Sequence, residues 1–248
     1  MKYRIGQIVP SSNVTMETEI PAIFRSRETI LPERFTFHSS RMRMKKVTKE
    51  ELEAMDAMSL KCAQELSDAH VDVMGYACLV AIMSMGRGYH SVSEVNLHQE
   101  TVANDFPTPI VTSAGALING LKVLGAKQIS IITPYMRPLT DMVVDYIENQ
   151  GIKVKQSIAL EIPDNLEVAA QNPMNLLEIY KQLDLTDVDV LVASACVQMP
   201  SLEAIDLIQA ECGIPVTSAA VCTTYEMMKK LGIEAKSAIG GELLSGKY

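Results

Sequence analysis

The chain has 248 residues, of which 48% are hydrophobic and 21% are charged, and its formal net charge is −8. This length suits one large α/β domain or two small lobes, and the composition is that of an ordinary globular protein. The sequence lacks a run of about 18 apolar residues that could span a membrane, and its acidity disfavours nucleic acids and anionic membranes as partners.

The N-terminus begins with a strand-like segment instead of the long apolar stretch of a secretory signal peptide. The chain has five cysteines, and no two of them are spaced as a CxxC pair. In a reducing compartment such cysteines are free thiols, buried or catalytic, and do not form a disulfide framework. We therefore expect a cytoplasmic protein.

Short apolar segments alternate with helical segments along the chain. The segments expected to form strands are, in order, 3–9, 71–77, 110–112, 129–133, 154–160 and 188–193. A helix is expected over 48–69, where Thr48 and Glu51 have the spacing of a capping box. This alternation predicts an α/β fold of mainly parallel sheets joined by crossover helices.

Three short motifs occur twice, in the same order, in the two halves of the chain. The pairs are IGQIVP and ISIITP, which end at Pro10 and Pro134; two AC pairs, which end at Cys78 and Cys196; and two TSA triplets, which begin at Thr112 and Thr217. Such echoes predict an internal duplication. We expect two pseudo-symmetric lobes in close contact, residues 1–113 with 217–248 returning to them, and residues 114–216.

Cys78 and Cys196 each follow an apolar strand. Ligands of open parallel sheets bind beyond the carboxyl ends of the strands, so two facing lobes would bring both cysteines to one cleft. The backbone N–H groups of a strand-to-helix turn favour a thiolate and a nearby carboxylate. On spacing alone, packing in the core is an equal alternative, because free cysteine is among the most buried residue types.

Other reactive side chains have simpler explanations. The remaining cysteines, Cys62, Cys212 and Cys222, are assigned to packing. The four histidines show no metal-ligand spacing, so we expect no metal site. Arg87, between Gly86 and Gly88, is explained better by a solvated loop than by a carboxylate clamp.

The motifs around the two cysteines resemble those of maleate cis-trans isomerases in the aspartate/glutamate racemase superfamily. The matching segments extend over nearly the whole chain: Pro10-Ser11-Ser12-Asn13, Ala77-Cys78-Leu79-Val80, Pro134-Tyr135, Pro163-Asp164-Asn165 and Ala195-Cys196-Val197-Gln198-Met199-Pro200. The resemblance implies two lobes around a central active-site cleft, a homo-oligomer, and a reaction that uses no cofactor. The implied substrate is a small dicarboxylate, maleate, which becomes fumarate.

The resemblance also implies roles for individual residues. Cys78 matches the nucleophile, whose thiolate adds to the alkene, and Cys196 matches the acid/base that assists elimination after rotation about the new single bond. The groups that match carboxylate ligands are the side chains of Asn13, Tyr135 and Asn165 and the backbone amides of Leu79, Val80 and Val197. Without the resemblance, Asn13 and Asn165 could be helix caps and Tyr135 an aromatic residue at a strand end.

Two other functions remain open. Racemases of the superfamily usually carry polar Cys-Asn-Thr and Gly-Cys-Thr motifs, whereas apolar Leu79 and Val197 follow the cysteines here, which disfavours an aspartate/glutamate-type racemase. Arylmalonate decarboxylases keep only the second cysteine, and Cys78 argues against that reaction. A two-lobed chain could also bind a small acid without catalysis. In an enzyme, we expect Cys78 to react with iodoacetamide faster than a free thiol does.

Overall fold

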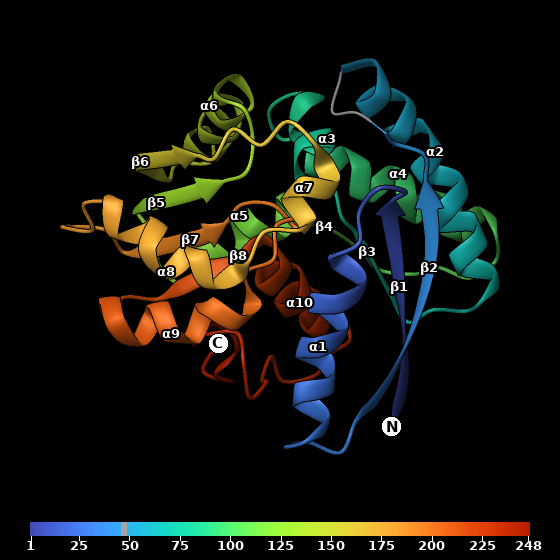
Figure 1. Cartoon of the computed structure of the whole chain (residues 1–248). Coiled ribbons are helices and arrows are strands. Elements are labelled where there is room, and N and C mark those ends of the chain that lie inside the picture. Colours follow the sequence, from blue (N-terminus) through green and yellow to red (C-terminus); the bar gives the residue numbers. More distant parts are fainter. Residues whose placement is uncertain (46–48) are drawn as a thin grey trace.

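The computed structural model describes residues 1–45 and 49–248. These residues form two four-stranded parallel sheets with equivalent strand orders, β2-β1-β3-β4 and β6-β5-β7-β8. Figure 1 shows the first sheet in blue to green and the second in yellow-green to orange-red, with helices around both. The predicted α/β fold with two pseudo-symmetric, helix-flanked sheets is therefore confirmed.

The elements have the following bounds. The first sheet contains β1 (Lys2–Pro10), β2 (Arg34–Met42), β3 (Val73–Tyr76) and β4 (Ile110–Thr112), and the second contains β5 (Gln128–Thr133), β6 (Lys153–Ala159), β7 (Val190–Ser194) and β8 (Val216–Ser218). The helices are α1 (Met16–Glu28), α2 (Lys49–Asp68), α3 (Leu79–Ser84), α4 (Tyr89–Ala103), α5 (Ser113–Val123), α6 (Arg137–Glu148), α7 (Asn165–Ala169), α8 (Leu176–Ile179), α9 (Leu202–Cys212) and α10 (Ala219–Lys230). Short 3-10 turns occur at Pro173–Asn175, Tyr180–Gln182 and Glu242–Leu244.

The buried parts of the central strands of both sheets are mostly apolar. In the first sheet Ile5 lies opposite Val73 and Ile8 lies opposite Tyr76, and all four residues are buried. Helices cover both faces of a parallel sheet, so its inner strands need apolar side chains on both sides. This requirement explains why these strands have no alternation of polar and apolar residues.

The six predicted strands correspond to β1 and β3 to β7, with ends that agree within two residues. The sequence analysis missed β2 and β8. β2 pairs only with β1 and contains the polar run His38-Ser39-Ser40-Arg41, and β8 has only three residues. The helix predicted over 48–69 is α2, but the proposed cap Thr48 lies outside the described residues.

α5 and α10 join the two halves of the fold. Each follows the last strand of its sheet, and the two helices pack against each other; α10 also contacts α1 and β3. β8 pairs with β7 as far as Ser218, so the second sheet extends two residues into the segment that was predicted to return at 217. The division into lobes at 113 and 217 remains a prediction. No helix in the described ranges is long and apolar enough to cross a membrane.

Candidate active site

A small cavity lies beyond the ends of β1, β3, β5 and β7. Its volume is about 30 Å³, which is room for about one water molecule. It is lined by Pro10, Asn13, Met44, Ala77, Cys78, Leu79, Val80, Tyr135, Asn165, Val197 and Gln198. Seven of the eight predicted site residues are in this set, and the eighth, Cys196, lies beside Tyr135. The two halves of the chain thus contribute to one partly open cavity.

Cys78 lies between β3 and α3, with an extended backbone (φ −165°). Burial raises the pKa of its thiol to about 12, although the backbone N–H of Ala81 acts in the opposite direction. The nearby Cys196 and Asp56 raise the pKa further. The turn therefore favours the thiolate as predicted, but burial outweighs it, and Cys78 is a neutral thiol at neutral pH.

Cys196 follows β7 and is 8% exposed. Burial raises the pKa of this thiol, while hydrogen bonds from the Tyr135 hydroxyl and from the backbone N–H groups of Gln198 and Met199 lower it. The Ser194 hydroxyl donates to the Cys196 carbonyl at 2.8 Å and holds the turn. The sulfur thus has several hydrogen-bond donors around it, as a thiol that gains and loses a proton requires.

Tyr135 lines the cavity and lies beside Cys196. Its hydroxyl donates to the Ala195 carbonyl at 3.3 Å, and the Cys196 sulfur becomes its alternative acceptor when that thiol is ionised. Burial raises the pKa of Tyr135 far above its ordinary value, and the neighbouring Cys196 and Cys78 raise it further. The hydroxyl therefore stays protonated and is a hydrogen-bond donor in the site.

Asn13 lies two residues before Thr15, which is the N-cap residue of α1, so the alternative that Asn13 is itself the N-cap is wrong. Its Oδ1 accepts hydrogen bonds from the backbone N–H groups of Thr15 (3.0 Å) and Met16 (2.9 Å), which holds the turn before the helix. The oxygen is thereby directed at the backbone, and the amide nitrogen is the donor that Asn13 can offer to a ligand in the cavity.

Asn165 is the first residue of α7, and the alternative that it caps this helix is wrong. The cap is Asp164, which accepts hydrogen bonds from the backbone N–H groups of Leu166 (2.8 Å) and Glu167 (3.0 Å). The Asn165 side chain instead donates to the Ser12 hydroxyl at 2.7 Å. It therefore connects the second half of the chain to the turn that carries Asn13.

The sequence analysis assigned no role to two residues of the cavity wall, Met44 and Gln198. Met44 follows β2, a strand that was not predicted, and a two-way hydrogen-bond pair between its backbone and the Ser11 hydroxyl holds it in place (3.0 and 3.2 Å). Gln198 belongs to the recognised Cys196 motif, but its bonds cross to the first half of the chain. Sequence spacing carries no signal for such contacts.

Other candidate groups lie outside the cavity. Arg87 is exposed and forms an ion pair with Asp145 on α6, so the solvated-loop interpretation describes it better than a clamp. Cys222 is buried beside the Thr217 hydroxyl (3.2 Å), as expected for packing, and Cys62 is buried on α2. The described parts of the chain contain no cluster of three His, Cys, Asp or Glu residues that could hold a metal ion.

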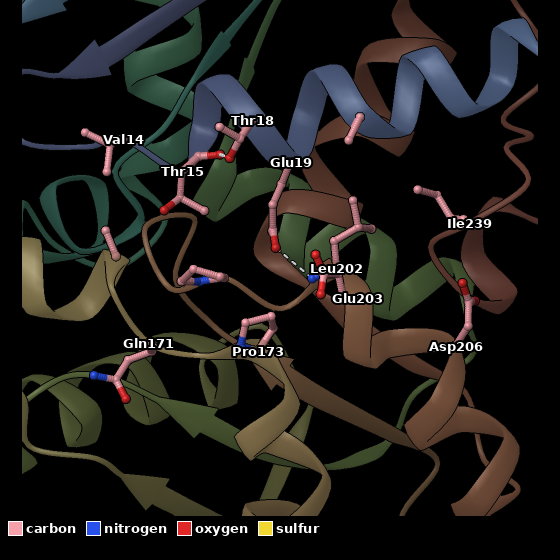
Figure 2. Close-up of a pocket in the computed structure, with 13 residues that line it drawn as sticks. Val14, Thr15, Thr18, Glu19, Gln171, Pro173, Leu202, Glu203, Asp206 and Ile239 are labelled. Atoms are coloured by element: carbon pink, nitrogen blue, oxygen red, sulfur yellow. Dashed lines mark hydrogen bonds between the residues drawn. The ribbon is translucent and has the colours of Figure 1, made fainter.

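A larger pocket of about 590 Å³ lies beside α1 and α9, and none of the predicted site residues lines it. Figure 2 shows the Glu19 carboxylate in this pocket, pointing from α1 to the start of α9. It accepts hydrogen bonds from the backbone N–H groups of Ser201 (2.5 Å) and Leu202 (2.6 Å). Burial raises the pKa of Glu19. Its contacts indicate a structural role, that of capping α9.

Comparisons with known proteins place the chain. A family model described as arylmalonate decarboxylase matches residues 5–244. Maleate isomerase of Pseudomonas putida is 61% identical over 246 residues, which are 99% of this chain and 98% of the relative. The crystal structure of a cysteine-to-alanine variant of the maleate isomerase Iso from Pseudomonas putida S16, with maleate, has a TM-score of 0.99 at 61% identity and covers 100% of this chain and 99% of that one.

A second solved structure is the maleate cis-trans isomerase of Nocardia farcinica, in a cysteine-to-serine variant with a covalently bound succinylcysteine intermediate. It has a TM-score of 0.95 at 40% identity, and the match covers all of both chains. The decarboxylase model thus describes the wider group, and the relatives at 40% to 61% identity define the narrower one. The chain belongs to the maleate isomerase family.

Proposed function

We propose that this enzyme isomerises maleate to fumarate with Cys78 as nucleophile and Cys196 as acid/base. The observation that carries the proposal is the cavity that Cys78, Asn13, Asn165 and Tyr135 line together, with Cys196 beside Tyr135. The Pseudomonas relative is solved with maleate, and the Nocardia relative holds a succinylcysteine. A succinyl group on sulfur is the product of adding a thiol across the double bond of maleate.

The reaction needs the double bond to become a single bond for a time. The Cys78 thiolate, which is the minor form of this thiol at neutral pH, forms a C–S bond to one alkene carbon, and the π electrons move to the other carbon and its carboxylate as an enediolate. Cys196 protonates that carbon and later removes a proton from it. Between these steps the central bond rotates. Elimination then breaks the C–S bond, restores the double bond and frees the Cys78 thiolate, so that atoms and electrons balance.

The polar groups around the cavity would hold the two carboxylates during rotation. The candidate donors are the side chains of Asn13, Tyr135 and Asn165 and the backbone N–H groups of Leu79, Val80 and Val197, all of which belong to lining residues. Fixed donors stabilise the charge that develops in the enediolate, and one such donor typically contributes about 3 kcal/mol to the transition state. No external cofactor is required by this sequence of steps.

Proton NMR of the purified protein with maleate, without added cofactor, tests the proposal. The fumarate signal should appear with the wild type and should be lost or severely reduced with Cys78→Ala and with Cys196→Ala. A reduced, folded wild-type protein that yields no fumarate would eliminate the isomerase. The racemase alternative would then be tested with aspartate and glutamate in deuterated water, where racemisation places deuterium at the α-carbon.

We also propose that the enzyme acts in the cytoplasm as a homo-oligomer. All five cysteines are free in the structure, and both reactive thiols must remain reduced, which a reducing compartment ensures. The oligomeric state follows from the family resemblance. Sedimentation velocity at micromolar concentration tests it, and a single monomeric species would contradict it.

A further inference from the structure

Gln198 is 3% exposed and lies two residues beyond Cys196, at the wall of the cavity. Its side-chain oxygen accepts a hydrogen bond from the backbone N–H of Val14 at 3.0 Å. Its side-chain nitrogen donates to the Ser12 carbonyl at 2.9 Å. These two bonds go to the residues immediately before and after Asn13, so the Gln198 amide fixes the turn that places Asn13 at the cavity.

The same amide also binds the backbone of the second asparagine, Asn165. The Gln198 nitrogen donates to the backbone carbonyl of Asn165 at 2.7 Å, while the Asn165 side chain donates to the Ser12 hydroxyl at 2.7 Å. The backbone carbonyl of Gln198 accepts a hydrogen bond from the Thr15 hydroxyl at 2.7 Å. One residue therefore connects three segments, namely the turn at 12–15, the start of α7 and the turn after Cys196.

We infer that Gln198 is a positioning residue that sets the separation of Asn13 and Asn165, and hence the span across which the two carboxylates are held. The inference rests on the proposed function, because it assigns those asparagines to the substrate. Only an amide provides one acceptor and two donors at this point. Since all three side-chain bonds go to main-chain atoms, they fix the backbone under both asparagines without contact to the reacting carbons.

The test compares Gln198→Glu and Gln198→Met with wild type. Glutamate keeps the shape and the acceptor for Val14 but places an anionic oxygen against the carbonyls of Ser12 and Asn165, and methionine keeps the volume without either kind of bond. Gln209→Glu is the matched control, because the Gln209 side chain likewise bonds to main-chain atoms, the N–H groups of Val216 and Glu242, and the residue does not line the cavity.

Misplacement of substrate-holding groups should lower kcat/KM for maleate by about 10²-fold in both Gln198 variants, through a raised KM and a lowered kcat. The control should stay within about twofold of wild type. In Gln198→Glu, the activity relative to wild type should rise as the pH falls, because a protonated carboxyl again donates one hydrogen bond. Thermal melting, measured on every variant, reports loss of folding separately.

The inference is overturned if folded Gln198→Glu and Gln198→Met both keep wild-type KM and kcat, or if Gln209→Glu loses as much activity as they do. If Gln198→Glu does not fold, the kinetics of Gln198→Met decide. An inactive wild type in the same assay would refute the proposed function instead, so the two failures are distinguishable.

Discussion

The raised pKa of Cys78 should make this thiol react slowly in the ligand-free protein. We predicted from the sequence that this thiol reacts faster than an ordinary one, whereas its raised pKa predicts a slower reaction. With a pKa of about 12, about one molecule in 10⁵ is ionised at pH 7. An ordinary thiol, with a pKa of about 8.5, is about 3% ionised at this pH. The difference of about 3.5 units corresponds to about 5 kcal/mol.

Part of this loss is offset, because a thiolate of higher pKa is a stronger nucleophile. With a Brønsted coefficient of about 0.45, the thiolate of Cys78 is more nucleophilic than an ordinary thiolate by about 1.5 orders of magnitude. Even so, Cys78 should react about 10²-fold more slowly than an ordinary thiol. The rate at which Cys78 is alkylated should rise with pH. The rise should be about tenfold per pH unit up to at least pH 10, because the thiolate fraction increases by that factor below the pKa of about 12.

Peptide mass spectrometry after timed exposure to iodoacetamide measures this rate between pH 6 and 10. Cys212 at the end of α9 is partly exposed and is a reference within the same chain. Alkylation of Cys78 at pH 7 as fast as that of Cys212, or a rate that levels off below pH 8, would refute the account. The enzyme would then hold a preformed thiolate, and burial would not be the dominant influence.

Three further predictions follow from single contacts. Tyr135→Phe removes the hydroxyl that donates to the Cys196 sulfur and should lower kcat by about 10²-fold with little change in melting temperature, which steady-state kinetics will show. Because burial raises the pKa of Glu19, the free energy of unfolding should fall as the pH rises from about 4.5 through the folded-state pKa. Urea titrations at several pH values should show a smaller dependence of this free energy on pH in Glu19→Gln. Arg87→Ala breaks an exposed ion pair with Asp145 and should leave the free energy of unfolding almost unchanged in the same titrations, with unchanged KM; a large rise in KM would mean that the loop reaches the substrate.

Most of the fold was predictable because its signals are local. The inner strands β1 and β5 are short apolar runs that need no knowledge of their neighbours, and they were found within one residue at each end. β2 failed because its sequence is polar, and its strand conformation depends on hydrogen bonds to β1, along which every residue from Arg34 to Met42 is paired. The strand β1, about thirty residues earlier in the chain, supplies the hydrogen-bond pairing that the sequence of β2 does not itself indicate.

The site was predictable for a different reason. Repetition of the motif around Cys78 and Cys196 indicated two equivalent strand ends, and the resemblance supplied the other residues; seven of the eight line one cavity. The sequence could not reveal how Gln198 contributes, because its bonds reach residues 184 and 186 positions away. It could not reveal the ionisation of Cys78 either, since burial depends on side chains from several elements.

The equivalent strand orders of the two sheets have a consequence for the origin of the site. Cys78 follows the third strand of the first half and Cys196 follows the third strand of the second. Two identical half-length chains paired about a twofold axis would already place one thiol on each side of a central cavity. Maleate itself has a twofold axis through its double bond. A symmetric pair of half-length chains would match that axis, and a single chain frees the two sulfurs to differ, as the proposed roles of nucleophile and acid require.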